Sequence, residues 1–222
     1  MAADIVFLVD VDNTLFDNDR FQQELREHLQ SAYGDHANEL YWAAFDKLRS
    51  ELGYVDYLGT LQRYRLEQPH DPRILRLASW LLEYPFADRL YPGALDAVRH
   101  IRQWGPAVIL SDGDAVFQPN KIDRSGLGRA FDGNILIYVH KEKELDAIER
   151  AYPAKHYVLI DDKLTILDAV KRGWGERVTT VFPRQGRYAL EAAARTDLLL
   201  ADIAIADIGG LTRYDLPSLN RA

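Results

Sequence analysis

The chain has 222 residues, and its 47% hydrophobic and 11% aromatic content is enough to bury one substantial core, alone or with a modest inserted subdomain. Its formal net charge of -7 argues against a nucleic-acid partner, because phosphate backbones are bound by accumulated Lys and Arg. It contains no cysteine, which excludes disulfides and thiolate chemistry, and its first apolar run, Ile5–Val9, is too short for a membrane span or a signal peptide. We therefore expect a soluble, cytoplasmic protein without a membrane partner, and the sequence does not indicate an oligomeric state.

The first predicted elements are a buried strand and a long helical segment. Ile5–Val9 has the continuous apolar run of a strand that is buried on both faces. In residues 18–90, which we call the insert, apolar residues recur at helical spacing. Three helix faces can be recognised: Phe21, Leu25 and Leu29; Leu40, Ala44, Leu48 and Leu52; and Ile74, Leu77 and Leu81. Gly53, Pro69 and Pro85 separate these helices.

After Pro92 the pattern changes to a regular alternation of helices and short apolar strands. Strands are expected at Ala107–Leu110, Ile135–Val139, His156–Ile160 and Val178–Phe182. Helices are expected at Gly93–Trp104, Pro119–Gly126, Glu142–Tyr152 and Leu164–Arg172, with a last helix and a short strand near Leu198–Leu200. Such alternation predicts a doubly wound α/β domain with a parallel sheet. This domain would comprise residues 1–17 and 91–222, with the insert as a helical subdomain.

Polar residues follow each of the first four predicted strands. In chain order they are Asp10 and Asp12; Ser111, Asp112, Gly113 and Asp114; His140 and Lys141; and Asp161 and Asp162. Because the carboxyl ends of parallel strands meet at one edge of a sheet, we expect these groups to converge. Clustered carboxylates repel one another, and a divalent cation that prefers oxygen ligands relieves the repulsion. The sequence therefore predicts a Mg²⁺ site at this edge.

These groups suit the transfer of a phosphoryl group. A carboxylate can attack phosphorus, and a second carboxylate two residues later can protonate the leaving alkoxide and then activate water. We therefore expect Asp10 to be the nucleophile and Asp12 the general acid and base. Both would also contribute to the metal site, which Asp161 and Asp162 would complete.

The transferring phosphate needs positive charge and hydrogen-bond donors around its oxygens. Lys141, the Ser111 hydroxyl and the backbone amides near Asp112 and Gly113 are the candidates for substrate binding.

The four polar segments, in this order over residues 6–168, resemble the four motifs of the haloacid dehalogenase (HAD) superfamily. The most specific of them is Asp10-Val11-Asp12-Asn13-Thr14. The resemblance implies a Rossmann-like core in which Asp10 is the nucleophile and Asp12 is the acid and base that also offers its backbone carbonyl to Mg²⁺. It implies that Ser111 and Lys141 bind the transferring phosphate, and that the insert is a helical cap that closes over the site and selects the substrate.

The chain departs from the family pattern at two places. Glu142 replaces a proline that many members have after the third-motif lysine, and Lys143 is an alternative to Lys141 as the phosphate-binding lysine. In the fourth motif, Ile166 stands where many members place a further acid. Metal ligation by Asp162 alone or by both adjacent acids therefore stays open.

Some polar residues have a simpler structural interpretation. Asp112 and Asp114 are expected chiefly to orient the backbone, and His140 to pack at a strand end. Arg184 and Arg187 follow the fifth predicted strand and could contact substrate. Most aromatic residues of the insert are expected in its core, with one or two facing the site: Tyr41, Trp42, Tyr54, Tyr57, Tyr64 and Trp80.

The leading functional hypothesis is a magnesium-dependent phosphatase that acts on a small phosphorylated metabolite through an aspartyl-phosphate intermediate. A hydrolytic dehalogenase is the main rival, and Asp12 argues against it because a halide leaves without a proton. A phosphoryl-transfer mutase would use the same residues with a different acceptor. A non-catalytic binding or scaffold protein would be expected to have lost a strand-end group, and none is missing.

Overall fold

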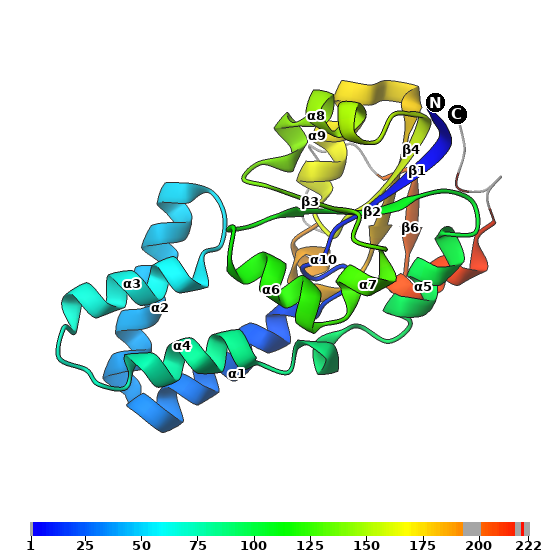
Figure 1. The fold of residues 1–222 in the computed structure, drawn as a ribbon. Coiled ribbons are helices and arrows are strands. Elements are labelled where there is room, and N and C mark those ends of the chain that lie inside the picture. Colours follow the sequence, from blue (N-terminus) through cyan, green and yellow to red (C-terminus); the bar gives the residue numbers. More distant parts are fainter. Residues whose placement is uncertain (1, 193–200, 216–218, 220–222) are drawn as a thin grey trace.

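The computed structural model describes residues 2–192, 201–215 and 219, and a six-stranded sheet forms its centre (Figure 1). Neighbouring strands all pair in parallel, in the order β3-β2-β1-β4-β5-β6. The strands are β1 (Ala3–Val9), β2 (Ala107–Asp112), β3 (Ile135–Tyr138), β4 (Ala154–Ile160), β5 (Val178–Pro183) and β6 (Ile203–Ile205). The prediction of a doubly wound parallel sheet is confirmed.

Strand β1 lies inside the sheet, which explains its unbroken apolar run. Phe7 pairs with Ala107 of β2 on one side and with Val158 of β4 on the other. Successive side chains point to opposite faces, so Phe7 belongs to one hydrophobic core and Val6 and Leu8 to the other. A strand that is paired along both edges and covered on both faces has to be apolar throughout. Its carboxyl end lies between those of β2 and β4.

Helices cover both faces of the sheet (Figure 1). One face packs against α5 (Ala94–Ile101), α6 (Phe117–Arg124), α7 (Leu127–Ala130) and the 3₁₀ helix η4 (Ile208–Arg213). The other face packs against α8 (Leu145–Ala151) and α9 (Leu164–Trp174). The remaining elements of this part are α10 (Gly186–Ala192) and the 3₁₀ helices η2 (Lys141–Lys143) and η3 (Gly175–Arg177).

Between β1 and β2 the chain forms a group of helices at one side of the sheet (Figure 1). They are α1 (Asn18–Tyr33), α2 (Asp35–Leu52), α3 (Tyr57–Glu67) and α4 (Ile74–Glu83), followed by the 3₁₀ helix η1 (Phe86–Arg89). Helices α1, α2 and α4 correspond to the three helix faces predicted from the sequence, and α3 was not predicted. The buried face of α3 consists of Tyr57, Thr60, Leu61 and Tyr64, so its apolar periodicity is weak. The division of the chain into a core and an inserted subdomain stays a prediction.

Aromatic packing holds the insert together and joins it to the sheet domain. The Phe21 ring of α1 lies 5.1 Å from Tyr57, 4.8 Å from Tyr84 and 5.8 Å from Phe117 of α6, measured between ring centroids. The contacts of Phe21 with Tyr57 and Tyr84 are edge-to-face, an arrangement that contributes more stability than the burial of apolar area alone. Four of the six aromatic residues named in the sequence analysis are buried, as expected: Tyr41, Trp42, Tyr57 and Tyr64.

Several predicted boundaries differ from the structure. The helix expected at 142–152 is divided into η2 and α8, and the helix expected at 119–126 begins earlier and is followed by α7. Strand β6 was not predicted, and the strand expected near Leu198–Leu200 lies outside the described residues. Among the helices that the structure describes, none combines the length and apolarity that a membrane crossing requires.

Candidate active site

The loop after β1 is held in place by the residues of its own motif. The Asp10 N–H donates to the Ile160 carbonyl at 2.9 Å, which continues the pairing with β4. Asn13 adopts a left-handed conformation with φ 60°, which Asn tolerates better than most side chains. The Thr14 hydroxyl accepts from the Asp162 N–H at 3.1 Å. The end of β1 is thus fixed to the loop after β4.

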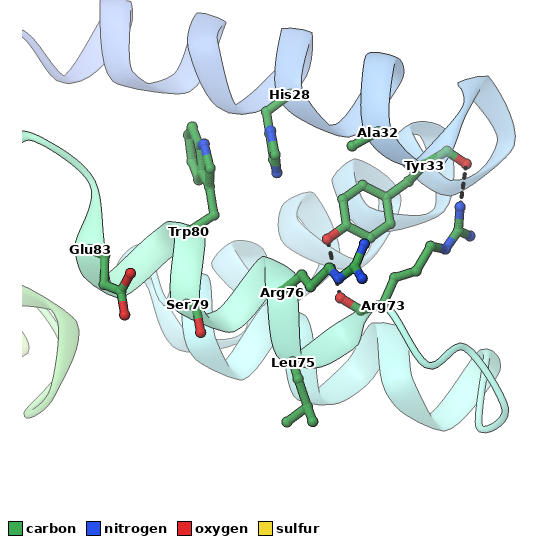
Figure 2. A pocket seen from close by; sticks show the side chains of 9 residues that line it. All are labelled: His28, Ala32, Tyr33, Arg73, Leu75, Arg76, Ser79, Trp80 and Glu83. Carbon is green, nitrogen blue, oxygen red and sulfur yellow. Dashed lines mark hydrogen bonds between the residues drawn. The ribbon is translucent and has the colours of Figure 1, made fainter.

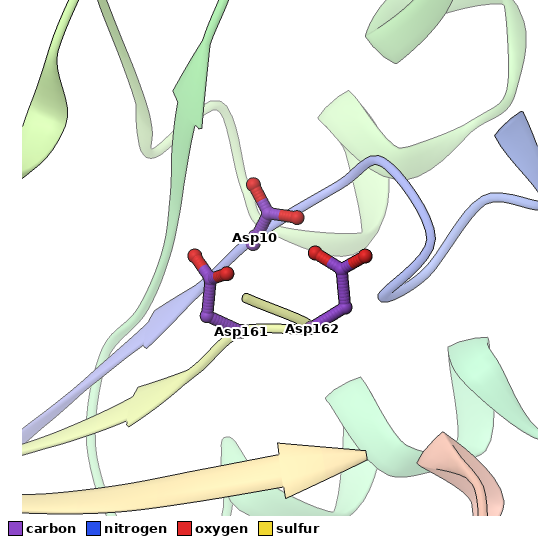
Figure 3. Close-up of side chains that lie close together, drawn as sticks. All are labelled: Asp10, Asp161 and Asp162. Carbon is purple, nitrogen blue, oxygen red and sulfur yellow. The ribbon is translucent and has the colours of Figure 1, made fainter. Parts of the chain in front are cut away.

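Three acids from these two loops form a buried cluster (Figure 3). Each of Asp10, Asp161 and Asp162 offers a carboxylate oxygen within 4.8 Å of the others. The Lys141 Nζ lies 2.6 Å from an oxygen of Asp10 and 2.6 Å from an oxygen of Asp161. Both carboxylate oxygens of Asp162 are buried without a hydrogen-bond partner. One ammonium therefore contacts two of the three buried carboxylates, and the carboxylate of the third accepts no hydrogen bond.

The pKa values in the cluster reflect this imbalance. Burial raises the pKa of Asp10 to about 6 although Lys141 opposes the shift. Burial, with the negative charges of Asp10 and Asp161, raises the pKa of Asp162 far above its ordinary range. Burial alone would lower the pKa of Lys141, but the two neighbouring carboxylates hold it above its usual value. The donor set of carboxylate oxygens fits a hard divalent cation, which would supply the missing positive charge.

The structure distinguishes between the two candidate lysines of the third motif. Lys141 is buried, and its Nζ also donates to the Leu110 carbonyl at 3.2 Å. Its backbone N–H donates to Asp112 at 2.8 Å, so Asp112 orients the backbone as expected. Lys143 is exposed to solvent. Of the two, only Lys141 contacts Asp10.

Asp12 is held by helix α6 rather than by the acidic cluster. Its Oδ1 lies 2.5 Å from the buried Lys121 Nζ, and its Oδ2 accepts from the Gln118 Nε2 at 3.2 Å. The same Gln118 Nε2 donates to the Ser111 hydroxyl at 2.8 Å. The Asp12 side chain keeps 29% of its surface exposed, whereas Asp10 is nearly covered. Asp12 is therefore positioned yet accessible, and its carboxylate is outside the group that could hold a metal.

Gln118 and Lys121 were not among the site residues predicted from the sequence. A signal was present, because the two lie three residues apart and share the buried face of α6 with Phe117 and Ile122. Polar residues on an otherwise apolar helix face usually have a partner, and here the partners are Asp12 and Ser111.

The loop after β2 has a structural role, which bears on the prediction that its backbone amides bind phosphate. Asp114 accepts from the N–H groups of Val116 and Phe117 at the start of α6, as expected. The Gly113 N–H donates to the Tyr138 carbonyl at 3.0 Å and is therefore engaged, which does not support its predicted use for phosphate binding. A Cβ atom at Gly113 would come 2.8 Å from the Gln118 Cβ. Glycine is required there for the close approach of α6.

A small cavity of about 90 Å³ lies where the insert meets the sheet domain. The sheet domain contributes Asp12, Asn13, Asp112, Lys163, Arg187 and Tyr188 to its lining, and the insert contributes Asn18, Arg49, Gly53, Tyr54 and Val55. Of the two arginines considered after the fifth strand, Arg187 faces this cavity and Arg184 is exposed. Through Asp12, Asp112 and Lys163 the cavity reaches the loops that follow β1, β2 and β4.

A larger hollow of about 560 Å³ lies between α1 and α4 (Figure 2). His28 stacks on Trp80 there at 4.6 Å between ring centroids, and the Arg73 carbonyl accepts from the Tyr33 hydroxyl at 3.1 Å. None of the strand-end residues lines it. It is not part of the candidate active site.

Solved structures show similarity over almost the whole chain. A protein of Burkholderia xenovorans LB400, described as a haloacid dehalogenase-like hydrolase, is 54% identical with a TM-score of 0.92, covering 98% of this chain and 99% of that chain. An L-2-haloacid dehalogenase of Xanthobacter autotrophicus with covalently bound chloropropionic acid is 15% identical with a TM-score of 0.62, covering 96% and 98%. The magnesium-bound YfnB of Bacillus subtilis, described as a HAD-hydrolase, is 14% identical with a TM-score of 0.62, covering 95% and 98%. The latter two show the fold alone.

The sequence comparison with curated proteins gave no match. A family model for haloacid dehalogenase-like hydrolases matches residues 6–173, which include the four strand-end segments. The resemblance recognised in the sequence is confirmed. With three quarters of its length matched by that model, the chain belongs to the haloacid dehalogenase-like hydrolases.

Proposed function

We propose that this hydrolase removes phosphate from small phosphomonoesters in a magnesium-dependent reaction with Asp10 as the nucleophile. The observation that carries the proposal is a second carboxylate, Asp12, which lines the cavity and is held in place by Lys121. A phosphate monoester leaves as an alkoxide, which needs a proton, and a positioned carboxylic acid can deliver one.

The proposed reaction consists of two displacements. A carboxylate oxygen of Asp10 bonds to phosphorus, the bond from phosphorus to the ester oxygen breaks, and the departing alkoxide takes a proton from Asp12. Asp12 then takes a proton from water, whose oxygen bonds to phosphorus as the bond from phosphorus to Asp10 breaks. Inorganic phosphate is released and both aspartates return to their starting states. Lys141 and the Ser111 hydroxyl would stabilise the charge on the transferring oxygens.

Asp10, Asp161 and Asp162 would hold the magnesium ion. Their oxygens converge, and the two partnerless oxygens of Asp162 provide donors that the protein itself does not use. When bound, the ion would neutralise the clustered carboxylates and draw charge from the phosphoryl oxygens. Magnesium on the same fold in YfnB supports this assignment.

Hydrolytic dehalogenation is the second candidate, and the L-2-haloacid dehalogenases with this fold favour it. Such an enzyme would use the same nucleophile to attack carbon. Its halide leaves without a proton, so it would gain nothing from Asp12. A mutase would pass the phosphoryl group to an acceptor other than water, and a scaffold protein would need none of these groups.

The test measures phosphate release from alkyl phosphomonoesters and from p-nitrophenyl phosphate, and chloride release from 2-chloropropionate, each with magnesium and with EDTA. We expect magnesium-dependent phosphate release that is lost in Asp10→Asn. Asp12→Asn should lower turnover of alkyl esters roughly 100-fold or more, and that of p-nitrophenyl phosphate much less, because p-nitrophenolate leaves without a proton.

Asp114→Asn is the matched control, because Asp114 caps α6 outside the cavity. Asp114→Asn should leave the ratio between the turnover of alkyl esters and that of p-nitrophenyl phosphate as it is in the parent enzyme. Chloride release that needs neither magnesium nor Asp12 would overturn the proposal in favour of a dehalogenase. Absence of both activities would favour phosphoryl transfer to another acceptor or a non-catalytic role.

A further inference from the structure

One end of the cavity carries a concentration of positive charge. Arg49 comes from α2 of the insert, Lys163 from the loop after β4 and Arg187 from α10, and they line the cavity around Tyr188. The Lys163 Nζ lies 5.4 Å from the centre of the Tyr188 ring, and the guanidinium carbon of Arg187 lies 5.0 Å from it. Three cations from three separate elements thus meet at one aromatic side chain.

The hydroxyl of Tyr188 accepts hydrogen bonds from two guanidinium groups. The Arg49 Nη2 donates to it at 3.0 Å and the Arg187 Nη2 at 3.2 Å. A neutral oxygen therefore holds two like charges close together, where a carboxylate would have compensated them. Arg187 has an acid nearby, since its Nε lies 3.6 Å from Asp19. Over the residues that the structure describes, Arg49 has no acidic partner.

The acids that line the same cavity do not supply the missing charge. Asp12 is already paired with Lys121, and Asp112 accepts the backbone N–H of Lys141. Arg49 is half-buried, so it has lost part of its hydration without gaining an anion. This end of the cavity, formed by Arg49, Lys163 and Arg187, is therefore prepared for an anionic group that the protein does not provide.

We propose that this end of the cavity binds a second anionic group of the substrate, a carboxylate or a second phosphate, separate from the phosphate that Asp10 attacks. The proposal rests on the phosphatase function and names the class of its substrate. A guanidinium binds either group through two parallel hydrogen bonds, and Arg49 is the guanidinium at this end of the cavity that has no acidic partner among the described residues. The cavity of about 90 Å³ is far smaller than the roughly 300–1,000 Å³ of drug-sized sites, which favours a small substrate.

The experiment compares three-carbon phosphomonoesters that differ only in the group at the far end: a hydroxyl, a carboxylate or a second phosphate. Values of kcat/KM are measured for the parent enzyme, Arg49→Met, Arg49→Lys and Arg65→Met. Arg65 is the matched control, because it is an exposed arginine of the insert outside the cavity. The Kd of each ester is also measured with the Asp10→Asn protein and with Asp10→Asn/Arg49→Met, so that binding is determined independently of turnover.

We expect the parent enzyme to prefer an anionic ester over the hydroxyl ester by roughly 10- to 100-fold. Arg49→Met should reduce this ratio to within a few-fold of one, Arg49→Lys should retain part of it, and Arg65→Met all of it. The carboxylate and bisphosphate esters show which anion is preferred.

Two outcomes would overturn the inference. Equal kcat/KM and Kd values for the charged and neutral esters would show that no second anion is recognised. An equal loss for all three esters in Arg49→Met would assign Arg49 to the transferring phosphate. Failure of the proposed function is distinguishable, because the parent enzyme would then release no phosphate while the Kd values still report whether Arg49 selects an anion.

Discussion

At the scale of single residues, Asp161 and Asp162 show how adjacent side chains can have opposite energetic effects. Asp161 is compensated, since one oxygen lies beside Lys141 and the other accepts the Lys163 N–H at 2.8 Å. Asp162 has neither kind of partner for its carboxylate. A buried charge without a partner destabilises the fold. Removing one partner of a compensated pair also destabilises the fold, because the other charge is then left buried without a partner.

We predict that Asp162→Asn stabilises the metal-free protein by about 1–3 kcal/mol at pH 8 and abolishes stabilisation by magnesium. Burial raises the pKa of Asp162 in the folded state, so that state binds more protons than the unfolded chain and the parent protein loses stability as pH rises. The advantage of the variant should therefore grow from pH 5 to pH 8. Urea unfolding with EDTA and with magnesium measures it.

Asp161→Asn is the control for this prediction, and it should destabilise the metal-free protein because it leaves Lys141 with one carboxylate fewer. If Asp162→Asn were as destabilising as Asp161→Asn in EDTA, the carboxylate of Asp162 would have to be solvated or bonded in solution.

The convergence of these acids was predictable from the sequence, because the end of a strand in a parallel sheet has a known location. The position of Lys141 near Asp10 was predictable for the same reason. That Lys141 contacts two of the acids and leaves Asp162 without a hydrogen-bond partner was not predictable, because this depends on side-chain directions. Arg49 was also beyond reach, because nothing in a helix pattern tells which arginine of the insert faces the cavity.

At the scale of elements, helix α6 links the loops after β1 and β2. Lys121 and Gln118 extend from one face of α6 to Asp12 and Ser111, while Phe117 packs into the aromatic core of the insert. The sequence predicted this helix from its position between two strands. Its contribution to the site was missed because the sequence alone does not give the rotation of a helix about its axis.

We predict that Lys121→Met lowers kcat by roughly 10- to 100-fold with little change in KM, because Asp12 loses the cation that fixes its carboxylate. Methionine can fill the same buried volume, so the fold should persist. Steady-state kinetics with an alkyl phosphomonoester measure the effect, and thermal unfolding checks the fold. Lys143→Met, at an exposed position, should leave kcat unchanged. An unchanged kcat in Lys121→Met would show that the ion pair does not position Asp12.

Elements outside the α/β alternation were predicted less well. Only one of the buried positions of helix α3 is aliphatic, and β6 is only three residues long with Ala204 exposed between two buried isoleucines. Short elements carry too little periodicity to be recognised without their neighbours. The sheet itself was predictable because each of its longer strands repeats the same buried pattern.

At the scale of the whole molecule, the position of the insert over the sheet decides how accessible the site is. Among the contacts that cross this junction are the hydrogen bond from Arg49 to Tyr188 and the approach of Gly53 to His140. Gly53 ends α2 in a left-handed conformation with φ 79°. A Cβ atom there would come 2.7 Å from the His140 Cε1. The backbone angle favours glycine, and a Cβ atom would also have to displace the His140 ring.

The Gly53 contact allows a test of whether insert and sheet domain meet in solution as they do here. Gly53→Ala should destabilise the protein by about 1–2 kcal/mol, partly from the left-handed backbone and partly from the clash with His140. In the His140→Ala variant the clash is absent, so Gly53→Ala should then cost only the free energy of placing alanine in a left-handed conformation. We therefore predict a coupling free energy of about 0.5–1 kcal/mol in the double-mutant cycle, measured by urea unfolding.

Additive effects would mean that the insert stands away from His140 in the free protein. Coupling that appears only when a phosphate analogue is added with magnesium would then show that ligand binding closes the junction.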